Sequence, residues 1–344
     1  MIYFDYAATN PFTKYPCSKY GQFLNPNANY AYKEQKLLED CANRVKAAIG
    51  AKSGKVVFGG TSSQLIENLF THIYEETNEY LTICSMYEHD SVWRFTNQWS
   101  NIDSLKHVIQ TYHGDKQLIV CLMVVNNITG EIMPVEEIGR LCHENDAFYI
   151  CDMTAQIGKA PIPANINQWC DCAVWSGHKL GTEGGIGAMW LSDKFNEWLG
   201  DFKLHGTPNL AGAMSITDAT EDACKSSMEH YTELYMQLYG KLVNANIQFQ
   251  IINGSVKTCA INAIMLDDIN ADSLQQYLAS KQIYIGIGGS ACSSLHDFRV
   301  LNAYGLTNDE ASRVVRVSFG DETTERDIDA FVNAVIEYKE KFVR

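Results

Sequence analysis

The feature that most constrains the fold of this chain is a regular alternation of short apolar runs with helical stretches. Apolar runs of strand length occupy residues 56–58, 81–84, 118–125, 148–151, 172–175 and 186–191. Stretches with helical character lie at residues 31–49, 64–75 and 135–145. This alternation predicts an α/β domain around a mostly parallel sheet.

The pattern changes near residue 209. A long helical stretch is predicted over residues 209–246, and the remaining predicted elements are strands at 249–252, 259–266 and 314–319 and helices at 271–280 and 325–342. These elements predict a smaller α+β domain. We therefore expect a large domain at residues 16–245, and a small domain that combines residues 246–344 with an N-terminal arm at residues 1–15.

Composition restricts the possible partners. The formal net charge of −14 and the scattered basic residues argue against direct nucleic-acid binding, although a basic protein partner stays open. No apolar run reaches the length of a membrane span, and Met1 to Asp5 lacks the order of a signal peptide. We therefore expect a cytoplasmic protein without a membrane anchor.

The eleven cysteines do not suggest a disulfide framework, because their number is odd and the chain is expected to be cytoplasmic. Cys170 and Cys172 have no second Cys/His pair at zinc-site spacing, so no metal site is expected. Most cysteines lie in apolar runs and are expected to be small core residues.

Candidate catalytic chemistry begins at Lys179, which follows the strand predicted at 172–175. Ligands of open α/β sheets bind at the carboxyl ends of strands. A partly desolvated lysine at such an end has a lowered pKa and forms imines readily. Ser176 and His178 flank it with donors suited to a phosphate. Taken alone, the same residues also fit an ordinary surface loop.

Three further strand ends carry polar groups. Asp152 ends a strand and suits the protonated pyridine nitrogen of pyridoxal phosphate, although an aspartate there is also a common helix cap. The loop 59–63 precedes a helix and suits a phosphate, although it also fits a simple turn. His89 follows another strand and suits ring stacking or proton transfer, although a lone histidine is more often structural.

The ordered set of motifs resembles the cysteine desulfurases of the NifS/IscS type, which are class V, fold-type I pyridoxal-phosphate enzymes. The motifs are Tyr3 to Pro11, Asn25-Pro26-Asn27, Glu88 to Val92, Val125 to Glu131, Asp152 to Lys159, Ser176 to Lys179, Gly289 to Ser294 and Val315 to Gly320. The resemblance spans nearly the whole chain. It implies a large domain with a mostly parallel seven-stranded sheet and a smaller α+β C-terminal domain.

The resemblance also implies roles for individual residues. Lys179 would hold pyridoxal 5'-phosphate as a Schiff base and move the α-proton, and His89 would stack on the ring and transfer protons. The remaining implied cofactor contacts are Asp152 at the pyridinium, Asn127 near the phenolic oxygen, and Ser62, Ser63, Ser176 and His178 at the phosphate. Thr207 would complete the phosphate site of a second subunit, which implies a homodimer with shared active sites.

The implied substrate is L-cysteine, with Arg316, Asn127 and Asn10 as its binding residues. A guanidinium suits the substrate carboxylate because it donates two parallel hydrogen bonds, although Arg316 also fits a surface position on an edge strand. Cys292 lies in a Gly- and Ser-rich segment that is expected to be flexible and exposed. Its thiolate would take the sulfur as a persulfide for a protein acceptor, although an inert thiol in a turn is the alternative.

The chain departs from the family pattern at several positions. Ala155 stands where the family has a glutamine near the phenolic oxygen, and Gln156, one residue later, is the remaining candidate for that contact. Ile128 replaces a glutamate, and Leu204-His205 replaces Arg-Ser before Gly206-Thr207. Ser62-Ser63-Gln64 stands where Ala-Thr-Glu is usual, and the segment after Cys292 is short.

These departures keep other functions open. A selenocysteine lyase, or another activity of the class V aminotransferase type, would use the same cofactor. A non-catalytic scaffold that binds a partner would not require Lys179, Asp152, His89, Arg316 and Cys292 together. The acceptor also stays open, with iron–sulfur assembly, tRNA thiolation and DNA sulfur modification as the alternatives.

Overall fold

The computed structural model describes residues 1–77, 79–254, 256–288 and 297–343. The chain forms two compact units. The large unit comprises Pro11–Val124 and Met133–Ser226, and the small unit comprises Met1–Asn10, Val125–Ile132 and Ser227–Arg344.

The large unit is built on a seven-stranded sheet with the order β2-β8-β7-β6-β5-β3-β4. Its strands are β2 (Lys55–Gly59), β3 (Tyr80–Ser85), β4 (Gln98–Ser100), β5 (Gln117–Cys121), β6 (Phe148–Asp152), β7 (Cys172–Ser176) and β8 (Gly187–Leu191). Within the described part of this sheet, β8 runs opposite to the other six strands. The expected seven-stranded, mostly parallel sheet is thus confirmed. The short strand β4 was not predicted, because Gln-Trp-Ser has no apolar pattern.

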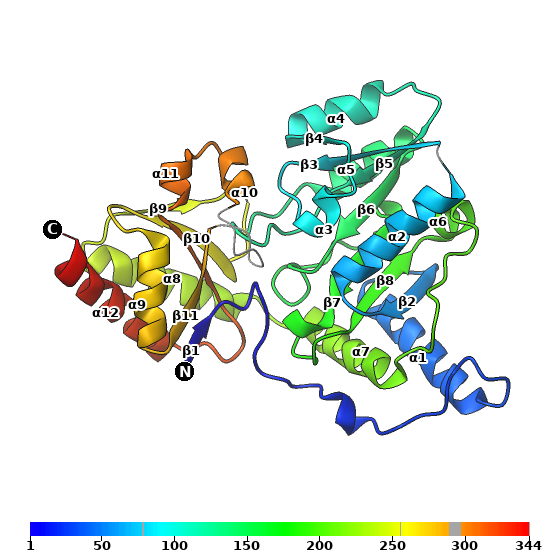
Figure 1. Ribbon diagram of the computed structural model, residues 1–344, viewed down its shortest axis with the longest axis horizontal. Coiled ribbons are helices and arrows are strands. Elements are labelled where there is room, and N and C mark those ends of the chain that lie inside the picture. The colour runs from blue at the N-terminus through cyan, green and yellow to red at the C-terminus, as the bar shows by residue number, and fades with distance from the viewer. Residues whose placement is uncertain (78, 255, 289–296, 344) are drawn as a thin grey trace. The chain divides into compact units, whose positions relative to one another are not determined.

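Helices cover both faces of this sheet. They are α1 (Tyr32–Ala48), α2 (Ser62–Glu76), α3 (Asp90–Trp93), α4 (Ile102–Thr111), α5 (Val135–Glu144), α6 (Asp193–Trp198) and α7 (Leu210–Lys225). Val174 of β7 lies in the apolar core with Leu65 of α2, whereas the next residue, Trp175, donates to Thr220 Oγ1 of α7 at 3.0 Å. Because neighbouring strand residues point to opposite faces, α2 and α7 lie on opposite sides. Helix α1 runs beside α7 (Figure 1).

Strand direction gathers the candidate loops of the large unit at one edge of the sheet. Strand β8 is antiparallel to both β2 and β7, so β2 runs parallel to β7 and to β6, β5 and β3. The carboxyl ends of these five strands therefore share one edge, where ligands of open α/β sheets bind.

The small unit contains a five-stranded sheet with the order β1-β11-β12-β10-β9. Its strands are β1 (Ile2–Phe4), β9 (Phe249–Ile252), β10 (Ile261–Leu266), β11 (Ile283–Ile287) and β12 (Val314–Ser318), and its helices are α8 (Glu229–Asn244), α9 (Ala271–Ser280), α10 (Arg299–Ala303), α11 (Asn308–Ala311) and α12 (Glu325–Phe342). The expected α+β character is confirmed. Strands β1 and β11 were not predicted.

The long helix expected over residues 209–246 is wrong. It is divided into α7 and α8, because Ser226 adopts an extended conformation with φ −66° and ψ 137°. The unit boundaries also differ from the expected domain limits. Helix α8 packs against α12 and so belongs to the small unit, as does the segment 125–132.

The ten described cysteines all carry free thiols, and seven of them are buried, in accord with the expected core role. Residue 292 lies outside the described part of the chain. Within that part, none of the helices has both the length and the apolarity needed to cross a bilayer.

The buried carboxylate of Asp171, in the loop before β7, forms a hydrogen bond with His143 of α5. His143 Nε2 lies 3.0 Å from Asp171 Oδ2, and its Nδ1 lies 3.1 Å from the carbonyl oxygen of Gln168. The hydrogen bond to Asp171 raises the pKa of His143 above its ordinary value of 6.5, although burial opposes it. The resulting stabilisation is complete below the unfolded-state pKa and is lost as pH rises through the folded-state pKa.

We therefore expect His143→Gln to reduce the free energy of unfolding more at about pH 5.5 than at about pH 8.5. Urea unfolding at the two pH values measures this difference, and His107→Gln, at an exposed site on α4, is the control. An equal loss of unfolding free energy at both pH values would rule out a charged pair of His143 and Asp171.

Candidate active site

The candidate lysine lies at the carboxyl end of β7. Strand β7 ends at Ser176 and passes into a 3-10 turn, Gly177–Lys179, in which Lys179 is half-buried. The N-terminal segment supports the loop after this turn. The backbone N–H groups of Lys14 and Tyr15 donate to the Gly181 carbonyl oxygen at 2.8 and 3.1 Å. Lys179 is thus held on a short, supported turn at the ligand-binding edge.

The loop after β2 meets this turn. Thr61 caps α2, and its side chain accepts from Gln64 N. Ser62 N donates to Ser176 Oγ at 3.2 Å, so the start of α2 and the end of β7 are in direct contact. Ser62 is buried and Ser63 is half-buried. A helix N-terminus with adjacent hydroxyls is suited to a phosphate.

His178 stands beside these hydroxyls as a neutral donor. Burial, followed by the positive charges of Lys179 and Lys159, lowers the pKa of His178 to about 4. The ring is therefore uncharged near neutral pH. Lys159 is only 5% exposed, and it was not assigned a role from the sequence. Its place in the motif Asp152 to Lys159, which follows a buried strand, could have indicated that it lies near the site.

Asp152 lies at the end of β6 and is buried. Its Oδ1 accepts from Thr154 N at 2.8 Å, and the Thr154 hydroxyl is buried without a partner among the described residues. Gln156 donates to the Pro161 carbonyl oxygen at 2.7 Å, and its Oε1 also has no partner among them. The amide of Gln156 is thus engaged with the following loop, and Ala155 beside it is buried.

His89 caps the short helix α3 after β3. Its Nδ1 accepts from Ser91 N at 3.2 Å and lies 2.9 Å from Ser91 Oγ. Because a backbone N–H can only donate, the neutral ring carries its proton on Nε2. The ring orientation of His89 is therefore fixed by α3.

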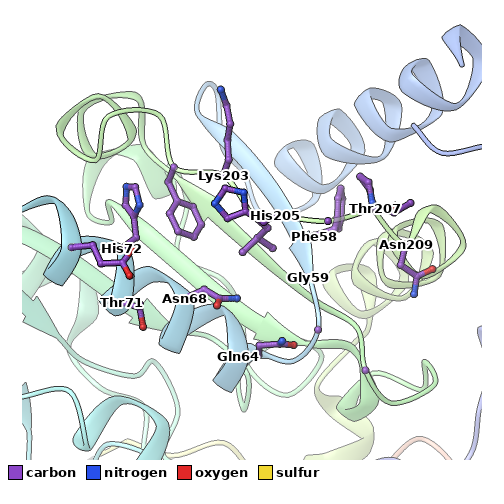
Figure 2. A pocket seen from close by; sticks show the side chains of 17 residues that line it. Phe58, Gly59, Gln64, Asn68, Thr71, His72, Lys203, His205, Thr207 and Asn209 are labelled. Carbon is purple, nitrogen blue, oxygen red and sulfur yellow. The ribbon is translucent and has the colours of Figure 1, made fainter. Parts of the chain in front are cut away.

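Thr207 lies on the segment that borders a polar cavity of about 600 Å³ in the large unit. Gly59, the last residue of β2, and Gln64, in α2, line the same cavity (Figure 2). Leu204 and His205, two of the departures from the family pattern, line it as well. Thr207 is exposed there.

The small unit holds the candidate substrate residues. Arg316 of β12 is fully buried, which excludes the surface alternative. It donates from Nη1 to the Asn127 carbonyl oxygen at 2.9 Å and from Nη2 to Asp5 Oδ1 at 2.6 Å, and its Nε has no partner among the described residues. Asp5 was not singled out from the sequence, although it belongs to the first motif. Asn10 ends the N-terminal segment of this unit.

These residues fit a pyridoxal phosphate. The helix start, Ser176 and neutral His178 suit its phosphate, and buried Asp152 suits its pyridinium nitrogen. The hydroxyl of Thr154 beside Asp152 has no partner in the described part of the chain, and a bound ligand can satisfy it. Lys179, on the turn next to Ser176, suits the cofactor's aldehyde.

Glycine at position 187 lets the start of β8 lie close to the loop between β2 and α2. A Cβ on Gly187 would lie 2.9 Å from the Thr61 carbonyl carbon and 3.0 Å from Ser62 N. We expect Gly187→Ala to displace the loop, at a cost of about 1–3 kcal/mol, and to weaken cofactor binding. Titration with the cofactor measures the affinity. Gly184→Ala, where an added Cβ meets nothing within 4 Å, is the control and should bind normally.

The chain is similar to known proteins over almost its full length. A family model described as Aminotransferase class-V matches residues 2–331. Cysteine desulfurase IscS of Rickettsia rickettsii (strain Iowa) is 27% identical, with 97% of this chain and 90% of the relative covered. The corresponding protein of Shewanella pealeana is 28% identical, with 98% and 92% covered.

A solved structure shares the fold. It is a NifS-like protein from Rickettsia africae ESF-5, with a TM-score of 0.83, 20% sequence identity and 99% of both chains covered. The match of the family model, together with the geometry at the ends of β2, β6 and β7, establishes that this chain belongs to the aminotransferase class-V family, whose cofactor is pyridoxal phosphate.

Proposed function

We propose that this protein is a cysteine desulfurase that converts L-cysteine to L-alanine and holds the removed sulfur as a persulfide on Cys292. The observation that carries the proposal is the arrangement of buried Asp152 and Ser176 and half-buried Lys179 at the carboxyl ends of β6 and β7. The similarity to proteins named cysteine desulfurase gives the reaction.

Each site residue has its own role in the proposed reaction. When bound, pyridoxal phosphate supplies the electron sink for the reaction. Lys179 moves the proton at the α-carbon, and His89 takes part in proton transfer. The buried guanidinium of Arg316 receives the substrate carboxylate, for which its Nε, which has no partner among the described residues, is a ready donor. The Cys292 thiolate attacks the substrate sulfur, and the S–S bond forms as the Cβ–S bond of the substrate breaks. The electron pair of the broken bond stays with the substrate carbon, which takes up a proton to give L-alanine.

The proposal includes two partners. Thr207 borders the cavity beside the phosphate loop, and we propose that it completes the phosphate site of a second copy of the chain. A sulfur acceptor protein would receive the persulfide. The many buried free thiols are in keeping with a reducing compartment such as the cytoplasm.

The test incubates the holoenzyme with L-cysteine, L-selenocysteine, or an amino acid and a keto acid. With a reducing thiol present to release the persulfide sulfur as sulfide, we expect L-alanine and sulfide from L-cysteine, and loss of sulfide release in Cys292→Ser although the cofactor stays bound. Transamination without sulfur release would replace it by an aminotransferase function. Sulfide release at the wild-type rate by Cys292→Ser would contradict the persulfide step.

A further inference from the structure

The residues around Asn127 form a closed turn in the small unit. Asn126 Oδ1 accepts from Ile128 N and Thr129 N, each at 2.9 Å, and Asn126 O accepts from Gly130 N at 2.9 Å. Asn126 and Thr129 are fully buried. The turn presents the Asn127 carbonyl oxygen to Arg316 Nη1 at 2.9 Å. The position of this turn therefore sets one of the anchors of the guanidinium.

The hydroxyl of Tyr304 contacts two residues in the second half of this turn. Thr129 Oγ1 donates to the Tyr304 hydroxyl at 3.0 Å, and that hydroxyl donates to the carboxylate of Glu131. The Tyr304 ring follows α10 and packs against a core cluster that includes Ile128. Burial raises the pKa of Glu131, and the hydrogen bond from Tyr304 opposes this effect.

Backbone bonds hold the far side of the turn. Thr258 N donates to the Gly130 carbonyl oxygen at 2.9 Å, and Ile132 N donates to the Val256 carbonyl oxygen at 2.9 Å. These bonds do not depend on the Tyr304 hydroxyl. Loss of that hydroxyl should therefore loosen Thr129 and the Glu131 side chain. The effect should reach the Asn127 side of the turn through Asn126, whose Oδ1 accepts from Thr129 N and whose N donates to the Glu131 carbonyl oxygen at 2.8 Å.

The guanidinium tolerates little displacement. A Cβ on Gly286 would lie 2.8 Å from Arg316 Nε and 2.7 Å from Asp5 Oδ1. Arg316 is thus confined between Asp5, the backbone of Gly286 and the Asn127 carbonyl oxygen. In such a site, a small shift of one anchor changes the direction in which the remaining donors point.

We propose that Glu131 and Tyr304 are positioning residues that hold the turn 126–131 and thereby orient Arg316 for an amino-acid carboxylate. The inference rests on the proposed function, because it takes Arg316 as the carboxylate-binding residue. Neither residue was assigned a role from the sequence, and only the hydrogen bonds to the turn reveal one.

The test compares two ligands that differ only in the carboxylate, L-alanine and ethylamine, by calorimetry on the holoenzyme. Tyr304→Phe should raise the Kd for L-alanine roughly tenfold and leave that for ethylamine unchanged. The KM for L-cysteine should rise with a much smaller change in kcat. Glu131→Gln, whose amide oxygen still accepts from Tyr304, should keep most of the affinity that Glu131→Ala loses. Tyr284→Phe, on the exposed side of β11, is the control.

Each possible result of the two-ligand comparison either supports or overturns the positioning role. Equal weakening of both ligands in Tyr304→Phe, or no weakening of L-alanine binding, would overturn the positioning role. If the wild-type enzyme makes no L-alanine from L-cysteine, the desulfurase proposal falls, whereas the two-ligand comparison still tests Glu131 and Tyr304 by itself.

Discussion

Replacing Lys179 by alanine is expected to abolish the covalent attachment of the cofactor and to lower L-alanine formation by at least about a thousandfold. Lys179 is half-buried on a turn that the N-terminal arm braces, next to the Ser176 hydroxyl that contacts the start of α2. Under the proposed function, an amine in this place would serve both cofactor attachment and proton transfer. Borohydride reduction followed by peptide mapping locates the attachment, and absorbance follows the bound cofactor.

The matched control is Lys194→Ala, at an exposed lysine of α6 in the same unit. It should keep both the attachment and the rate. Retention of the reducible attachment in Lys179→Ala would place the cofactor on another amine, and a wild-type rate in that variant would remove Lys179 from the chemistry.

Replacing Arg316 by glutamine is expected to raise the KM for L-cysteine roughly a hundredfold. The same change should reduce the free energy of unfolding by about 3 kcal/mol, because it removes the cation that pairs with Asp5. The side chain of Arg316 is 1% exposed and that of Asp5 is 21% exposed, so the remaining carboxylate is only partly hydrated. Steady-state kinetics and urea unfolding measure the two effects.

A second substitution separates these effects. Asp5→Asn combined with Arg316→Gln removes the uncompensated charge, and it should recover part of the stability without recovering the KM. Arg313→Gln, at a residue that forms an i,i+4 pair with Asp309, is the control and should leave the KM unchanged. Recovery of the KM in the double variant would show that Arg316 acts through stability alone.

The sequence predicted the large sheet well because its strands are buried runs with a clear length. Elements without a clear apolar pattern were not predicted correctly. Strand β11 contains Gly286, which weakens the strand signal but is required by the nearby guanidinium of Arg316. The break between α7 and α8 was missed because no proline or glycine marks it; Ser226 and its neighbours leave the helix through backbone conformation alone.

The same limit applies to the candidate site: residues marked by an apolar run could be proposed from the sequence, and their distant partners could not. Asp152 and Ser176 could be proposed from the sequence because each directly follows an apolar run, and Lys179 because it lies on the turn after one of these runs. The partners of Arg316 could not, because Asp5 is 311 positions away in the sequence and Asn127 contributes its backbone carbonyl rather than its side chain. Glu131 and Tyr304 give no sequence signal, since their meeting depends on how the turn and α10 fold together.

The most direct test of the desulfurase function is the mass of the peptide that contains Cys292 after brief incubation of the holoenzyme with L-cysteine, with persulfides trapped by alkylation. The account predicts a gain of one sulfur atom on Cys292, dependent on L-cysteine and absent in Lys179→Ala. Release of L-alanine and sulfide with no sulfur ever detected on Cys292, and at the same rate in Cys292→Ser, would contradict it.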